Sequence, residues 1–177
     1  MLGRFRLFIP LFLSFCLTAC HDKKAAVETN KLSQNQVTEK LLDANKSVVE
    51  LENTQINKLI KSSGWKMFET PTGLRYQILE KGNGPKTSIG KLVGFEYEVK
   101  LYSGEMIYSS AKSGLKEFSI GSGGVESGLE EGILLLRVGD KARLIIPSYL
   151  AHGLSGDQDK IPPKATLIYT LKLINLK

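Results

Sequence analysis

One stretch of the sequence, Gly121–Gly153, constrains the fold more than any other part of the chain. It reads GSGGVESGLEEGILLLRVGDKARLIIPSYLAHG and opens on a glycine-rich turn. Residues 127–130 then have the S-x-x-E spacing of a helix capping box. Leu129, Ile133 and Leu136 recur at i, i+4 and i+7, so a short helix with one buried face is predicted.

A strand is expected directly after this helix. The helix should end near Val138, because Gly139-Asp140 is typical of a turn. Apolar residues between positions 141 and 146 alternate with Lys141 and Arg143, as in a half-buried strand, and Pro147 ends the run. The stretch therefore predicts a small helix packed on a sheet, with glycines at the mouth beside its N-terminal end.

The order of short motifs here resembles that of the FKBP-type peptidyl-prolyl isomerases. The family patterns V-x-x-G-[WL]-E-E-G, V-G, P-x-x-[LY]-A-[YH]-G and I-P-P-x-[AS]-T-L are similar to Val125–Gly132, Val138-Gly139, Ser148–Gly153 and Ile161–Leu167. The likeness covers residues 72–177. It implies an α+β domain, in which an antiparallel half-barrel sheet wraps around one short helix.

Alternating patterns elsewhere agree with an antiparallel α+β domain. Several short strands are expected around one short helix, with few long helices between them. The expected strands cover residues 74–80, 93–101, 106–109, 118–120 and 166–177, with a hairpin turn at Ser103-Gly104.

The resemblance implies an enzyme that speeds rotation about the bond preceding proline. Amide resonance gives this rotation a barrier of about 18–20 kcal/mol. An apolar hollow that removes water from the amide favours the twisted, less charge-separated state, so neither a cofactor nor a metal is expected. The chain has no G-x-S-x-G, H-E-x-x-H or P-loop motif, which fits a catalyst built from shape alone.

The family's pocket residues can be matched to this sequence one by one. The resemblance assigns substrate-binding roles to Ile107, Tyr108 and Phe118, and catalytic roles to Tyr97, Val125, Glu126, Leu129, His152, Ile161 and Tyr169. Glu126 would act through its backbone N–H, and His152 would donate a hydrogen bond from its ring. The alternative for Tyr97, Phe118 and Tyr169 is a place in the core, and for His152 a place on a loop.

One departure from the family pattern bears on activity. The family's F-D-S-S is Ile107-Tyr108-Ser109-Ser110 in this chain, so a tyrosine replaces the pocket aspartate. We expect reduced catalysis as a result. Tyr108 could also fill the hollow from the side. The alternatives to an isomerase are then a non-catalytic chaperone with a degenerate pocket, or a purely structural lipoprotein.

The loop between Gly153 and Pro163 overhangs the mouth of the hollow in the family. Asp157 and Asp159 have the spacing of part of a calcium loop, but no glycine and glutamate follow at the later positions. We therefore expect the two aspartates to form a solvated loop tip.

The first residues predict export and a lipid anchor. Arg4 and Arg6 precede an apolar run of about eleven residues, which is shorter than the ~20 needed to span a bilayer. The run ends Leu17-Thr18-Ala19-Cys20, which resembles a bacterial lipobox, so residues 1–19 would be a signal peptide and Cys20 the lipidated residue. The alternative is an ordinary secretory signal. A lipidated Cys20 would hold the protein at a membrane of the bacterial cell envelope, where proline-containing exported polypeptides would be its substrates.

A flexible tether (residues 20–35) and a helix (residues 36–64) are expected before the domain. Val37, Leu41, Ala44, Val48 and Leu51 form an apolar stripe, which Ile56, Leu59 and Ile60 continue after a slip in spacing. An apolar stripe must be buried, either on a second copy, giving a homodimer through residues 36–62, or on the domain itself. The macrophage-infectivity-potentiator branch of the family, which this arrangement resembles, dimerises through such helices.

Charge gives little support to a nucleic-acid partner. The chain has 24 Lys and Arg residues, 18 Asp and Glu residues and a net charge of +6. The basic residues are spread along the chain and mixed with acidic ones, which favours a solvated surface over a nucleic-acid site.

Overall fold

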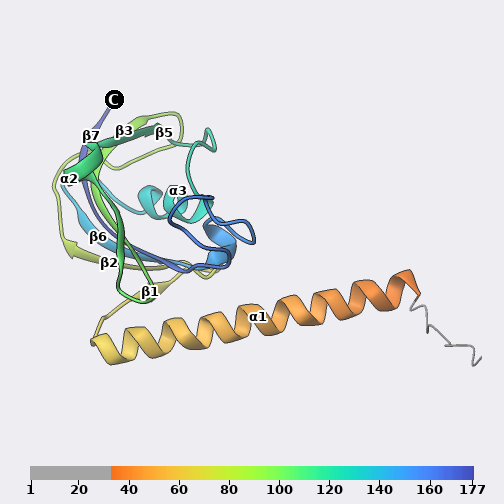
Figure 1. Cartoon of the computed structure of the whole chain (residues 1–177). Coiled ribbons are helices and arrows are strands. Elements are labelled where there is room, and N and C mark those ends of the chain that lie inside the picture. Colours follow the sequence, from red (N-terminus) through yellow and green to blue (C-terminus); the bar gives the residue numbers. More distant parts are fainter. Residues whose placement is uncertain (1–32) are drawn as a thin grey trace, which may run out of the picture.

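A computed structural model describes residues 33–177 of the chain (Figure 1). The predicted signal peptide, Cys20 and most of the predicted tether lie outside the described residues. The helices are α1 (Gln34–Ser63), α2 (Ser110–Ser113), α3 (Ser127–Leu134) and the short 3-10 helix η1 (Ser148–Leu150), and the strands are β1 (Phe68–Glu69), β2 (Arg75–Glu80), β3 (Leu92–Leu101), β4 (Met106–Ser109), β5 (Lys116–Ser119), β6 (Lys141–Ile146) and β7 (Leu167–Leu176).

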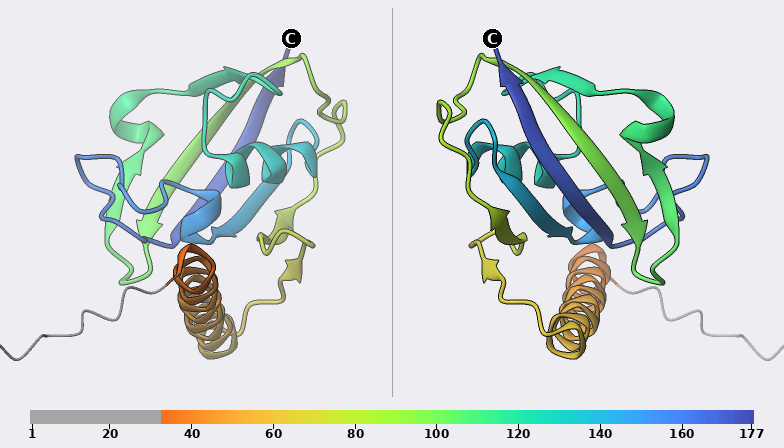
Figure 2. Two further views of the ribbon diagram at one scale, coloured as in Figure 1. Left: turned by 90° about the vertical axis from the view of Figure 1, so that its right-hand side faces the viewer. Right: turned by 90° about the vertical axis from the view of Figure 1, so that its left-hand side faces the viewer.

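The strands form one antiparallel sheet that curves around α3 (Figures 1 and 2). Its order is β1-β2-β6-β7-β3-β4, and β5 also pairs with β3. In the pairing of β3 with β7, Val99 lies opposite Tyr169 and Tyr97 lies opposite Leu171. Side chains two residues apart share a face of a strand, so this register places Tyr97 and Tyr169 diagonally on the concave face. The predicted α+β half-barrel is confirmed.

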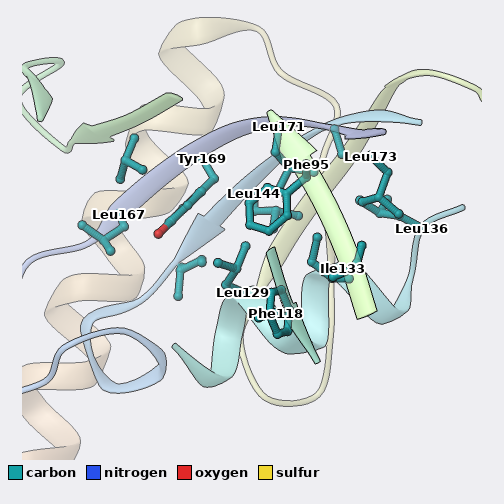
Figure 3. Packing of buried hydrophobic residues seen from close by; sticks show 14 of the residues in the cluster. Phe95, Phe118, Leu129, Ile133, Leu136, Leu144, Leu167, Tyr169, Leu171 and Leu173 are labelled. Atoms are coloured by element: carbon teal, nitrogen blue, oxygen red, sulfur yellow. The ribbon is translucent and has the colours of Figure 1, made fainter. Parts of the chain in front are cut away.

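The main core lies between α3 and the concave face of the sheet (Figure 3). Leu129, Ile133 and Leu136 are all fully buried, as their spacing predicts. Gly132 allows α3 to approach the sheet closely, because a Cβ atom at this position would overlap the side chain of Leu144 on β6. Close packing of α3 on β6 therefore depends on a helical residue without a side chain.

The predicted ends of α3 were wrong at both termini. The N-cap residue is Glu126, and no side-chain capping bond forms. The Ser127 hydroxyl donates to the Leu150 carbonyl at 3.2 Å, and the Glu130 carboxylate accepts from the Gly121 N–H, so both capping-box side chains have long-range partners instead. The helix ends at Leu134 rather than near Val138, because residues 137–138 pair with residues 84–86.

The long helix α1 begins two residues before the predicted start. Ser33 and Gln36 form the capping box that the sequence analysis overlooked: the Ser33 N–H donates to the Gln36 side chain at 2.9 Å, and the Gln36 N–H donates to the Ser33 hydroxyl at 3.3 Å. Gly64 ends the helix in the left-handed conformation (φ 66°), as expected. None of the helices in residues 33–177 is long and apolar enough to cross a membrane.

Only the C-terminal half of α1 packs on the domain. Ile56 is fully buried against Ile145 and Ile168 on the convex face of the sheet, so the predicted docking within one chain occurs here. The N-terminal half extends beyond the domain (Figures 1 and 2). Leu41 and Leu51 are 60% and 61% exposed. The apolar residues before the slip in spacing therefore form an exposed stripe, and those after it form the face that docks on the domain.

Candidate functional site

An open hollow of about 700 Å³ lies at the concave side of the sheet. Its walls come from β3, β4, the loop after α2, the glycine turn before α3, the start of β7 and residues 151–161 above them. The lining residues are Tyr97, Val99, Tyr108, Ser113, Gly114, Leu115, Lys116, Gly123, Gly124, Val125, Glu126, Ala151, His152, Asp157, Ile161 and Tyr169.

Seven of the ten predicted pocket residues line this hollow. They are Tyr97, Tyr108, Val125, Glu126, His152, Ile161 and Tyr169. The other three, Ile107, Phe118 and Leu129, are buried in the core and do not reach the lining. Phe118 packs edge-on against Phe95, with ring centroids 6.0 Å apart, so its core alternative describes its position.

Two tyrosines of the sheet face the hollow in different ways. Tyr97 is half-buried, and its hydroxyl lies 2.8 Å from the Ser113 hydroxyl. Tyr169 is only 3% exposed, and its hydroxyl donates to the Glu126 carboxylate at 2.8 Å. Burial, followed by the neighbouring Glu126 charge, raises the pKa of Tyr169 well above its usual value, so this hydroxyl remains a donor.

Glu126 brings a carboxylate into the wall of the hollow. One of its oxygens, Oε1, lies 2.8 Å from the Tyr169 hydroxyl and 3.0 Å from His152 Nε2. Burial alone would raise the pKa of Glu126. Its own backbone N–H, the charge of Lys116 and these two hydrogen bonds outweigh burial and lower the pKa below the usual value. Only a backbone role was predicted for Glu126 from the sequence, and the part played by its side chain was not predicted.

His152 has a side-chain partner that the sequence did not predict. We expected its ring to donate a hydrogen bond to a substrate. Nε2 lies 3.0 Å from a carboxylate oxygen of Glu126, and the other ring nitrogen, Nδ1, does not take part in this contact. His152 therefore links the loop above the hollow to the wall beside α3.

Tyr108 lies in the wall and leaves the hollow open. Its hydroxyl donates to the Asp157 carboxylate and lies 3.2 Å from Asp159. Burial, together with these carboxylates, raises the pKa of Tyr108, so the phenol stays protonated. The family aspartate is absent from β4, but the loop above the hollow places the Asp157 carboxylate in the same wall.

The prediction of a solvated tip is wrong for Asp157. This residue is half-buried, lines the hollow and accepts hydrogen bonds from the backbone N–H groups of Ile161 at 2.7 Å and Asp159 at 3.0 Å. Burial would raise the pKa of Asp157, but the bonds from Tyr108 and the two N–H groups lower it to about 2. Asp159 is exposed, as expected.

Helix α1 contacts the segment that leads into the loop above the hollow. The buried Glu52 carboxylate accepts from the Ser148 N–H at 2.7 Å, the Ser148 hydroxyl at 2.9 Å and the Thr166 hydroxyl at 2.5 Å. Ser148 begins η1, three residues before Ala151 and four before His152, both of which line the hollow. Sequence reasoning missed Glu52, because a glutamate in a long polar helix gives no sign that it is buried.

Comparison with known proteins identifies the family. The family described as FKBP-type peptidyl-prolyl cis-trans isomerase matches residues 84–174, which is more than half of the chain and includes every predicted pocket residue. The chain belongs to the FKBP-type peptidyl-prolyl isomerase family. The resemblance inferred from the motifs is thereby confirmed.

Several FKBP relatives are similar over the same region. The chain is 42% identical over 105 residues to FK506-binding protein 4 of Dictyostelium discoideum, covering 59% of this chain and 29% of the relative. It is 38% identical over 108 residues to the probable FKBP-type isomerase FkpA of Neisseria meningitidis, covering 60% and 39%. FK506-binding protein 2 of Yarrowia lipolytica is 35% identical, with 63% and 78% covered. The chain thus spans well under half of the first two relatives.

Solved FKBP structures have the same fold. FkpA of Escherichia coli is 27% identical with a TM-score of 0.64, and the match covers 83% of this chain and 74% of that one. A peptidyl-prolyl isomerase of Pseudomonas syringae is 27% identical with a TM-score of 0.63, covering 75% and 95%. These likenesses confirm the FKBP-like half-barrel.

Proposed function

We propose that this protein catalyses cis-trans isomerisation of prolyl bonds in exported polypeptides at the bacterial cell envelope. The observation that carries the proposal is the open hollow of the FKBP domain, with Tyr97, Val125 and Ile161 in its lining. A prolyl ring is of a size to enter such a hollow, and Tyr108 does not block it.

The chemistry follows from the lining. Apolar side chains on either side of the prolyl amide would remove water from it, and this favours the twisted state over the planar, more polar one. No bond is made or broken in the rotation, so the hollow needs no nucleophile. The polar groups that face it would hold the peptide in place while the bond turns.

A peptide assay tests this function. Folded wild-type protein should accelerate the cis-to-trans conversion of a Xaa-Pro peptide and the refolding of a protein whose slow phase is prolyl isomerisation. Tyr97→Ala should reduce both rates about tenfold or more, through loss of an aromatic wall. Background rates in both assays with folded wild-type protein would disprove the enzymatic proposal.

A second candidate is a binding module that holds unfolded or proline-bearing segments without speeding rotation. The replacement of the family's pocket aspartate by Tyr108 on β4 favours it, because the expected loss of catalysis would leave a hollow that still binds peptide. If wild type and Tyr97→Ala suppress aggregation of an unfolded protein equally well, with no rate effect, this candidate replaces the first. The alternative of a purely structural lipoprotein depended on Tyr108 filling the hollow. Tyr108 lies in the wall of an open hollow, so this alternative has no support.

We also propose a lipid anchor at Cys20 and a homodimer through α1. The lipobox-like Leu17-Thr18-Ala19-Cys20 supports the anchor. The exposed stripe of Val37, Leu41, Val48 and Leu51 supports the dimer, since four apolar side chains on one helix face remain in solvent in a single copy.

A further inference from the structure

The wall of the hollow contains a carboxylate oxygen that is buried without a hydrogen-bond donor. The Glu126 side chain is 7% exposed. Its Oε1 oxygen accepts from Tyr169 and His152, whereas Oε2 is shielded from solvent and accepts no hydrogen bond from another residue among residues 33–177. Buried carboxylate oxygens nearly always have donors, so an orphaned one in a binding hollow calls for an explanation.

The lining around this oxygen is acidic. Glu126 and Asp157 both have lowered pKa values, about 2 for Asp157, so both are ionised at neutral pH. They are accompanied in the lining by Lys116 and by His152, which is charged only when protonated. Lys160 lies outside the lining, over the Tyr108 ring at 5.0 Å. With His152 neutral, the side chains of the lining therefore carry one net negative charge, on a chain whose net charge is +6.

The position of Glu126 suits contact with a bound peptide. It follows Val125 in the lining, and its two donors come from β7 and from the loop above the hollow, so the carboxylate lies between these two walls. The last torsion of a glutamate side chain is soft. A donor entering the hollow would reach Oε2 by rotation about this torsion, which turns the whole carboxylate and therefore also shifts Oε1 relative to Tyr169 and His152.

We infer that the Glu126 carboxylate is a specificity-determining group that selects polypeptides in which lysine or arginine adjoins the proline. The ammonium or guanidinium group would donate to Oε2, while the prolyl ring occupies the apolar part of the hollow. Hydrogen bonds between a cation and a carboxylate are stronger than neutral ones, and the partly buried position limits screening by salt. This inference rests on the proposed isomerase function, because it names the substrate class of the same site.

Lysine and norleucine provide a matched pair of substrates. They share a straight four-carbon side chain, and only lysine carries the ammonium group. Turnover and equilibrium binding are measured for Lys-Pro, norleucine-Pro, Pro-Lys and Pro-norleucine peptides of otherwise identical sequence. We expect kcat/KM to be about tenfold higher for the lysine peptide in at least one position, with most of the difference in KM.

A charge-removing variant assigns this preference to Glu126. Glu126→Gln keeps the size of the side chain and its hydrogen bonds to Tyr169 and His152, and it should reduce the ratio of lysine to norleucine to about one. Glu117→Gln is the matched control, because it removes one acidic charge on β5 outside the lining and should leave the ratio at its wild-type value.

The outcomes separate this inference from the proposed function. Equal kcat/KM and equal affinity for lysine and norleucine peptides in both positions would overturn the inference, even with an active enzyme. An unchanged ratio in folded Glu126→Gln would overturn it as well. If no peptide is turned over, the isomerase proposal fails, but tighter binding of the lysine peptide would still support cation selection. If Glu126→Gln does not fold, the wild-type comparison still decides whether the hollow selects cations, and equal values for lysine and norleucine still overturn the inference.

Discussion

At the scale of single residues, the Tyr108–Asp157 pair shows how this hollow differs from the family pattern. A phenol on β4 and a carboxylate on the loop above the hollow replace the expected aspartate. A partly buried phenol needs an acceptor, and that requirement was the available sequence signal for Asp157. The acidic loop resembles an ordinary solvated tip in sequence, which masks this signal.

Replacing Asp157 should have a pH-dependent effect on stability. The folded pKa of about 2 lies below the usual value near 3.9, so the ionised carboxylate stabilises the fold above about pH 4. Asp157→Asn should lower the free energy of unfolding by about 1 kcal/mol at pH 7, where partial solvent access limits the loss. This difference from wild type should shrink as the pH falls from 4 through 2.

Urea unfolding at pH 7 and at about pH 2.5 measures the effect of Asp157→Asn. The control is Asp159→Asn in the same loop, since Asp159 is exposed and makes the longer contact with Tyr108, at 3.2 Å. It should change stability much less. A difference between Asp157→Asn and wild type that does not vary with pH would contradict the assignment of the low pKa.

A second residue-scale prediction concerns the contact between α3 and β6. Gly132→Ala would place a methyl group inside the Leu144 side chain, so it should destabilise the domain by about 1–3 kcal/mol despite the higher helix propensity of alanine. Gly124→Ala is the control, because its added methyl group meets no atom within 4 Å. Similar thermal unfolding midpoints for the two variants would argue against this packing.

At the scale of elements, the periodic segments could be predicted and the ends of the helices could not. The alternation in residues 93–101 and 167–173 was strong enough to place β3 and β7, because each strand has one face in the core. The capping-box pattern at Ser127–Glu130 misled the analysis, since both side chains bond to distant segments. Long-range partners of this kind leave no local signal.

Helix α1 should affect turnover through Glu52. Its carboxylate accepts three hydrogen bonds from the segment that leads into the loop above the hollow and from Thr166. Glu52→Gln replaces one acceptor oxygen by a donor NH₂ group, so it should lower stability by about 1–3 kcal/mol and also reduce peptide turnover. The exposed Glu50→Gln should change neither. Full turnover by a destabilised Glu52→Gln would show that α1 has only a structural effect.

The exposed half of α1 should mediate self-association if our dimer proposal is correct. Replacing Leu41 and Val48 by serine removes apolar side chains from the stripe without touching the docked half. Sedimentation equilibrium should show a dimer for the chain beginning at residue 21 and a weaker one for the double variant. A wild-type monomer at high concentration would refute the dimer.

At the scale of the whole molecule, the anchor and the domain can be tested separately. Full-length protein expressed in a bacterium should fractionate with membranes and incorporate labelled palmitate, because a lipidated Cys20 would carry the several acyl chains that stable anchoring requires. Cys20→Ser lacks the thiol that would be lipidated, so it should be unlabelled and released from the membrane. Peptide turnover should be the same in both, because the FKBP domain covers residues 84–174, far from Cys20 in the chain. An unlabelled wild-type protein of mature size would favour an ordinary secretory signal.

At this scale the motifs predicted the fold and most of the lining residues, but not the carboxylates in the wall of the hollow. Seven of ten predicted residues reach the lining, because the family pattern fixes their places on the sheet and loops. The acidic wall was missed, since Glu126 acquires its role only when β7 brings Tyr169 beside it.

One sheet separates α1 from the hollow. Ile145 and Ile168 face the helix, while their neighbours Leu144 and Tyr169 point to the opposite side. A second copy joined along the exposed stripe would contact residues of α1, and none of the residues that line the hollow belongs to that helix. Two such entrances on one assembly could engage successive prolines of the same nascent client, so that release from one is followed by recapture at the other.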